Sequence, residues 1–95
     1  MGIDGEVTLT GTLICTTEEE AARVRAALDS HIALTRAETG CLSFEVTQSN
    51  DPMIWTVSER FLNAASFEAH QTRAGASDWA VETKGITRDY KISGI

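Results

Sequence analysis

Two side chains that can exchange protons near neutral pH, those of Glu59 and His70, lie in the second half of the chain. An imidazole titrates close to neutrality and is a common general acid or base. Glu59 shares strand parity with Trp55 and Phe61, so we expect its carboxylate to point into an apolar layer. Burial there raises its pKa and a cationic partner lowers it. The alternative to a catalytic pair is a hydrogen bond between Glu59 and His70 that only orients them.

Aromatic side chains could form a pocket for a flat ligand beside these two residues. Flat rings hold a flat aromatic compound by stacking, and the residues that we expect to bind a substrate are Trp55, Trp79, Tyr90, Phe44 and Arg88. Trp79 follows an irregular Ala-Gly-Ala-Ser-Asp segment that could form a lid. For Phe44, packing in the core is the alternative. We expect His31, near the end of the first predicted helix, to be partly solvated.

No sequence motif for a metal or nucleotide site is present. There is no CxxC pair and no HExxH, and the two histidines, His31 and His70, lie on different predicted helices. The glycine patterns of dinucleotide and nucleotide phosphate loops do not occur either. We therefore expect neither a metal nor another cofactor.

Alternation and capping residues predict where strands and helices begin and end. Thr16 or Thr17 and Asn63 are suitable N-caps, and Gly40 would supply a left-handed stop after the first helix. The helix face predicted to be buried carries Ala21, Val24, Leu28 and Ile32. The predicted order is a strand over 7–15, a helix from the Thr16 or Thr17 cap to Glu38, strands over 41–48 and 53–61, a helix from Asn63 to about Gly75, a short turn over 78–82 ended by Gly85, and a strand over 87–93.

This β-α-β-β-α-β order is that of a ferredoxin-like α+β sandwich with an antiparallel sheet. Apolar residues occur at both parities of the strands, for example Trp55 and Val57 on one and Ile54 on the other. The pattern predicts that both faces of the sheet are covered, as when two protomers pack into a dimeric α+β barrel. We therefore expect a homodimer of one domain spanning 1–95, with a mobile start over Met1 to Gly5.

Three segments carry a resemblance to a known family: Glu38 to Val46, Thr56 to Phe61, and Phe67-Glu68-Ala69-His70. A glycine leading into a strand, then a hairpin that ends in Glu-Arg-aromatic ahead of a helix with His, resembles antibiotic biosynthesis monooxygenase (ABM) domains. The resemblance spans nearly the whole chain and implies a small dimeric α+β barrel. Enzymes resembling it oxygenate polyphenols, anthrones or quinols without metal or flavin.

Residue by residue, Glu59, Arg60 and His70 fit the ABM pattern, whereas Phe61 replaces the Trp frequently found after Glu-Arg. Haem-degrading relatives use a helix His as the iron ligand with an Asn nearby. Here the first strand has Thr8, Thr10 and Thr12 where that Asn would be wanted, so haem degradation is not expected.

Charge and cysteine content narrow the choice of partners and compartment. A net charge of −6 disfavours nucleic acid or an anionic membrane as partner. Cys15 and Cys41 suit free thiols, and no apolar stretch is long enough to span a membrane, so we expect a cytoplasmic protein.

Three functions stay open: a cofactor-independent monooxygenase or quinol oxidase acting on a small aromatic compound, a non-catalytic module binding a small hydrophobic ligand, and an accessory or stress-related dimer without chemistry.

Overall fold

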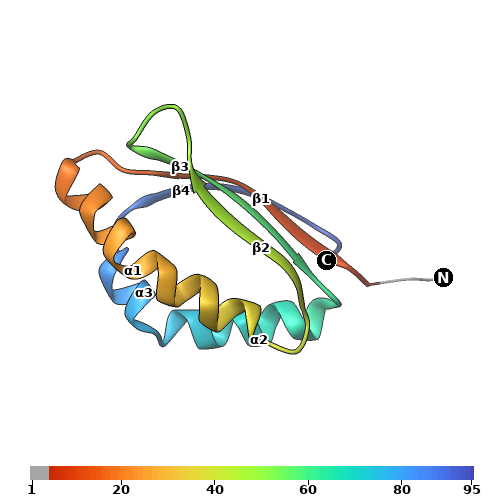
Figure 1. Cartoon of the computed structure of the whole chain (residues 1–95). Helices are drawn as coiled ribbons and strands as arrows, with labels where there is room; N and C mark the ends of the chain where they lie inside the picture. The colour runs from red at the N-terminus through yellow and green to blue at the C-terminus, as the bar shows by residue number, and fades with distance from the viewer. Residues whose placement is uncertain (1–4) are drawn as a thin grey trace.

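The protein, seen in a computed structural model that describes residues 5–95, has one sheet with all helices on one side (Figure 1). The expectation of a mobile start over Met1 to Gly5 lies, apart from Gly5, outside the described residues. The elements are β1 (Val7–Ile14), α1 (Glu18–Arg36), β2 (Cys41–Gln48), β3 (Ile54–Phe61), α2 (Ala64–Gly75), α3 (Asp78–Glu82) and β4 (Thr87–Ser93). The sheet is antiparallel with the strand order β2-β3-β1-β4. The predicted ferredoxin-like α+β fold is confirmed.

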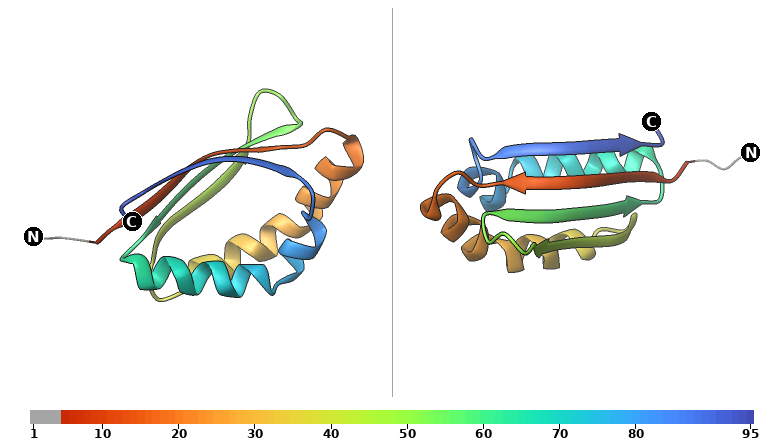
Figure 2. Two further views of the ribbon diagram at one scale, coloured as in Figure 1. Left: turned by 180° about the vertical axis from the view of Figure 1, so that it is seen from behind. Right: turned by 90° about the horizontal axis from the view of Figure 1, so that it is seen from above.

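The two long helices cover different halves of the sheet. Seen from above, α1 lies under the side of β2, and α2 lies under the side of β1 and β4 (Figure 2). The short helix α3 follows α2 and packs beside α1. The inner face of β1 and β4 therefore lies next to α2 and α3. The candidate site is found between them.

Side chains cap both long helices as expected. The Thr17 hydroxyl accepts a hydrogen bond from the backbone N–H of Glu20 at 3.1 Å, and the Asn63 side chain accepts one from Ser66 at 2.8 Å. After α3, whose C-cap is Thr83, Gly85 adopts a positive φ of 86° in the turn that leads to β4, so it shapes that turn and is not the residue that ends the helix.

The end of α1 differs from the prediction. The helix ends at Arg36, with Ala37 as its C-cap, and not at Glu38. Gly40 does not have a positive φ, so the prediction of a left-handed stop there is wrong. Glycine is needed at this position for another reason, because a Cβ on Gly40 would overlap the side chain of Ser66 in α2. The close approach brings the segment after α1 against α2.

The core lies between the sheet and the helices. The inner residues of the strands alternate with exposed ones, most clearly in β3, where Trp55, Val57, Glu59 and Phe61 are buried. On α1 the buried positions are Ala21, Val24, Leu28, His31 and Thr35. The expected fourth member, Ile32, is only partly buried, because the helical repeat turns His31 toward the sheet instead.

The outer face of the sheet is more polar than the sequence pattern indicated. Ile14 pairs with Ile54 at one end, but most other outward positions carry threonine, serine or charged side chains, among them Thr8, Thr10, Thr12, Thr56, Ser58 and Lys91. The expectation of apolar residues over both faces is therefore wrong for most of the sheet. Hydroxyl and charged groups can remain hydrated there without loss of core packing.

Candidate active site

A cavity of about 270 Å³ lies between α2, α3 and the inner face of β1 and β4. Its lining is Leu9, His31, Glu59, His70, Gln71, Ala74, Gly75, Trp79, Ala80, Arg88, Tyr90 and Ile92. Five of the predicted site residues therefore meet at one cavity: Glu59, His70, Trp79, Arg88 and Tyr90. The other two, Phe44 and Trp55, are buried in the core and are not among the lining residues.

Strand register explains how three of these side chains meet. Glu59 lies on β3 opposite Leu9 of β1, and β1 in turn pairs with β4, where Gly11 faces Tyr90 and Leu13 faces Arg88. Since alternate residues of a strand point to the same face, Glu59, Tyr90 and Arg88 all point toward the helices. Arg88 is held by hydrogen bonds from its guanidinium to the backbone oxygens of Thr83 and Ile86 and to the Thr83 hydroxyl.

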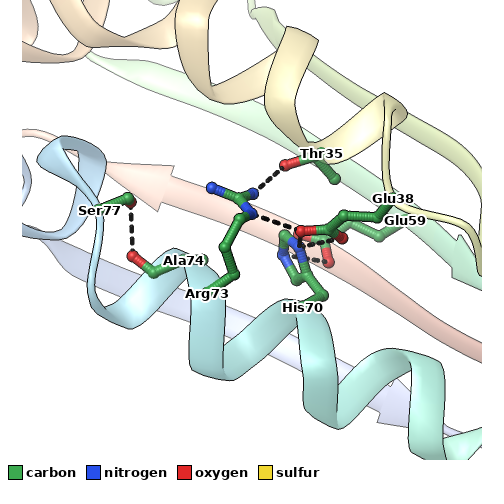
Figure 3. Close-up of polar contacts among 7 residues, drawn as sticks. All are labelled: Thr35, Glu38, Glu59, His70, Arg73, Ala74 and Ser77. Carbon is green, nitrogen blue, oxygen red and sulfur yellow. Dashed lines mark hydrogen bonds and ion pairs between the residues drawn. The ribbon is translucent and has the colours of Figure 1, made fainter.

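His70 occupies the centre of a chain of charged and polar side chains (Figure 3). Its Nδ1 lies 3.0 and 3.3 Å from the two carboxylate oxygens of Glu38. Arg73, one turn further along α2, donates from Nε to the same carboxylate at 2.6 Å and from its terminal nitrogen to the Thr35 hydroxyl at 3.0 Å. On the opposite side of the imidazole, Nε2 lies 3.9 Å from Glu59 Oε1.

Glu59 is the buried acid of this group. It is 6% exposed, and Oε1 has no hydrogen-bond partner among the described residues. Burial, and after it the negative charge of Glu38, raises the pKa of the Glu59 carboxyl from 4.5 to about 7. The 3.9 Å gap to His70 is too long for a hydrogen bond. An oxygen atom of a ligand placed beside both groups could therefore bond to either.

Burial lowers the pKa of His70, although the neighbouring Glu38 carboxylate opposes that shift. The imidazole is thus neutral at pH 7 and able to accept a proton. Across the cavity, burial raises the pKa of the Tyr90 phenol, against which Arg88 acts. The cavity therefore combines a proton acceptor at the Glu59 end with a hydroxyl donor and a fixed cation at the β4 end.

His31 forms the wall between this cavity and a second one. Its ring stacks on Trp79 with a centroid separation of 4.4 Å and meets Phe44 edge-on at 5.3 Å. Both His31 and Trp79 also line a cavity of about 410 Å³ between α1 and α3. The stacked pair thus separates the two spaces.

The sequence profile of the family described as antibiotic biosynthesis monooxygenase matches residues 11–81. The chain belongs to the ABM family. No curated protein sequence matches this ABM protein.

Solved structures agree with this ABM protein in fold at low sequence identity. Rv0793 from Mycobacterium tuberculosis superposes with a TM-score of 0.80 at 19% identity, over 95% of this chain and 94% of that one. PA3566 from Pseudomonas aeruginosa gives 0.78 at 22% identity, over 100% and 96%. SnoaB from Streptomyces nogalater, described as a cofactor-independent oxygenase, gives 0.78 at 12% identity, over 97% and 94%.

The position of His31 in the ABM protein corrects the expectation of a partly solvated histidine. Its side chain belongs to the core and is 4% exposed. The spacing of the buried residues Ala21, Val24, Leu28 and Thr35 could have indicated it, because position 31 continues that helical stripe. Burial, aided by the positive charges of His70, Arg73 and Arg88, lowers the pKa of His31 from 6.5 to about 3.

We expect His31→Phe to make the ABM protein less sensitive to acid. Because the folded pKa of His31 lies below the unfolded one, its contribution to stability is complete above pH 6.5 and is lost as the pH falls toward 3. At pH 4.5 that loss is roughly 2 to 3 kcal/mol. Urea unfolding at pH 7.5 and 4.5 should show a smaller difference for the variant than for the unchanged protein. Equal differences would contradict the buried neutral state.

Residues 5–95 of the ABM protein contain neither a cluster of metal ligands nor a membrane-spanning helix. No three His, Cys, Asp or Glu side chains in that range are grouped so that they could hold a metal ion. None of the helices in the same range has the length and apolar character needed to cross a membrane.

Proposed function

We propose that this ABM protein is a cofactor-independent monooxygenase that oxygenates a small aromatic hydroxy compound of the quinol or anthrone type. The observation that carries the proposal is that the buried Glu59 carboxyl and the His70 imidazole lie 3.9 Å apart at one cavity, where burial raises the pKa of Glu59 to about 7. A general base works best when its pKa lies near the working pH. The structural neighbour SnoaB, a cofactor-independent oxygenase, supports the same class of reaction.

In the proposed reaction, Glu59 or His70 takes the proton of an acidic hydroxyl or ring C–H group. The resulting anion is electron-rich enough to transfer an electron to dioxygen, and the two radicals combine as a peroxide on a ring carbon. Loss of the hydrogen that remains on that carbon as a proton breaks the O–O bond and leaves a carbonyl group. One oxygen atom remains on the substrate, the other leaves as water, and the substrate supplies all four electrons.

The other end of the cavity would bind the anion. The Arg88 guanidinium carries a fixed positive charge, and the raised pKa of Tyr90 keeps its phenol protonated and able to donate a hydrogen bond. Trp79, stacked on His31, offers an aromatic wall for a flat ring. A volume of about 270 Å³ is at the small end of ligand sites, which run from roughly 300 Å³ upward, so a substrate of one or two rings is favoured.

The test is oxygen uptake with a panel of quinols and anthrones, corrected for oxidation without protein. We expect turnover with one-ring or two-ring quinols and a product that contains one atom of ¹⁸O from ¹⁸O₂. An unlabelled quinone together with hydrogen peroxide would indicate a quinol oxidase instead of a monooxygenase. A rise in melting temperature with these compounds but no turnover would indicate that the protein is a ligand-binding module and not an enzyme.

For assembly and location, the proposal includes a homodimer in the cytoplasm. The centre of the outer sheet face carries uncharged hydroxyl side chains, which include Thr10, Thr56 and Ser58, and these can bond across an interface with a second copy. Sedimentation at micromolar concentration should give a dimer, and a monomer would contradict this part. The free thiols Cys15 and Cys41 support a reducing compartment.

A further inference from the structure

We propose that Glu38 is a positioning residue, which fixes the His70 imidazole with its proton on Nδ1 and its free lone pair on Nε2, toward Glu59 and the cavity. The use of that lone pair in a reaction rests on the proposed function, whereas the fixed tautomer does not. Nothing in the motifs or in the comparisons gives Glu38 a role.

The geometry leaves the Glu38 carboxylate one role toward the imidazole. Both carboxylate oxygens lie within 3.3 Å of His70 Nδ1, and an ionised carboxylate can only accept hydrogen bonds. The tautomer with its proton on Nε2 would direct the Nδ1 lone pair at negative oxygen atoms. The repulsion between them selects the tautomer with N–H on Nδ1.

Arg73 holds the carboxylate in this position. Its Nε donates to Glu38 Oε2 at 2.6 Å, while its terminal nitrogen is fixed by the Thr35 hydroxyl at 3.0 Å. Arg73 and His70 are neighbours on one face of α2, so one side of the helix binds the carboxylate through two side chains. The segment after α1 that carries Glu38 lies close to α2 because Gly40 has no side chain.

Every other charged or titratable group around His70 is compatible with this assignment. From β3, Glu59 faces Nε2 at 3.9 Å, and its protonated form, which burial favours, can present an O–H to the free lone pair. From α1, the His31 ring lies at a centroid distance of 6.0 Å and is neutral. The Arg73 guanidinium lies on the Glu38 side, where it lowers the pKa of His70 and so favours the neutral ring.

The test is ¹⁵N NMR of the imidazole nitrogens in the full chain without substrate. In the unchanged protein at pH 7, the His70 signals should be those of a neutral ring protonated on Nδ1, with the two histidines told apart by His31→Phe. In Glu38→Gln the amide can donate as well as accept, so we expect a large share of the Nε2–H form. Dominance of the Nε2–H form in the unchanged protein, or an unaltered tautomer in Glu38→Gln, would overturn the proposal.

Glu45→Gln is the matched control, because Glu45 is also a glutamate bonded to an arginine, Arg36, at 3.1 Å, but on the exposed outer side. It should leave the His70 spectrum unchanged. If quinol oxidation is found, Glu38→Gln should lower kcat about 10- to 100-fold with little change in KM, a loss of the size seen when a metal-bound histidine loses its hydrogen-bond partner. A switched tautomer in a protein without turnover would sustain the positioning role and reject the proposed function.

Discussion

Replacing Glu59 with glutamine should lower kcat for quinol oxidation about 10²- to 10⁴-fold, the usual contribution of a general base. The amide has nearly the same shape as the carboxyl but cannot take a proton from a substrate. The buried position would still be filled, so the surrounding contacts of β3 should remain. KM should change little, because Arg88 and Tyr90 at the other end of the cavity are untouched.

The same substitution should stabilise the protein at alkaline pH. The folded pKa of Glu59, about 7, lies above the unfolded value of 4.5, so the folded state binds the proton more tightly. Its contribution to stability is present below pH 4.5 and is lost as the pH rises to about 7. The shift corresponds to roughly 3 kcal/mol, which Glu59→Gln should recover at pH 8 but not at pH 4.

Urea unfolding at pH 4 and 8, with oxygen uptake at pH 8, measures both effects on the same variant. Glu45→Gln serves as the control, because the Glu45 carboxyl is 62% exposed and should change neither quantity appreciably. Full activity in Glu59→Gln would show that Glu59 is not the general base. Lower stability at pH 8 would mean that the carboxylate is satisfied in the folded protein, against the unpartnered Oε1 seen in the structure.

Local patterns predicted those parts of the site that depend on one element at a time. The alternation of β3 predicted Glu59 on one face with Trp55 and Phe61, and the same two-residue repeat puts Arg88 and Tyr90 on one face of β4. These predictions need only the repeat of a strand, which sterics impose on any sequence. The caps Thr17 and Asn63 are likewise local, since each bonds to a backbone group three residues away.

Contacts between distant segments could not be predicted in this way. Glu38 and His70 come from either side of the β2–β3 hairpin and meet because Gly40 lets the segment after α1 approach Ser66. Neither residue type by itself indicates the other. The prediction of a partly solvated His31 was wrong because positions 31 and 32 both fit a helical stripe. Isoleucine is buried more often than histidine, so the pattern favoured Ile32 as the buried residue.

His70→Asn should lower kcat about 10²- to 10⁴-fold while the melting temperature changes little. An asparagine amide can place an N–H near the position of Nδ1, so the Glu38 carboxylate keeps a donor. It has no counterpart to Nε2 and no group that accepts a proton near neutral pH. The variant thus removes the proposed proton transfer and leaves the bond to Glu38 in place.

His70→Ala does not make this distinction, because it also removes packing and a hydrogen-bond donor. The imidazole is 3% exposed and lies at centroid distances of 4.9 Å from Phe61 and 5.7 Å from Phe44. Truncation would open a space beside both rings and leave the partly buried Glu38 carboxylate with one partner fewer, at a loss of roughly 3 kcal/mol or more. Loss of activity in His70→Ala alone would therefore have two explanations.

The comparison of the two variants by oxygen uptake and thermal unfolding separates chemistry from structure. If His70→Asn is stable but inactive and His70→Ala is unstable, then Nε2 carries out the proton transfer, and the Nδ1 bond to Glu38 stabilises the folded protein. Normal turnover in His70→Asn would instead leave His70 as a structural link between α2 and Glu38. In that case Glu59 would have to act as the only base, and the pH dependence of kcat/KM should follow its single pKa of about 7.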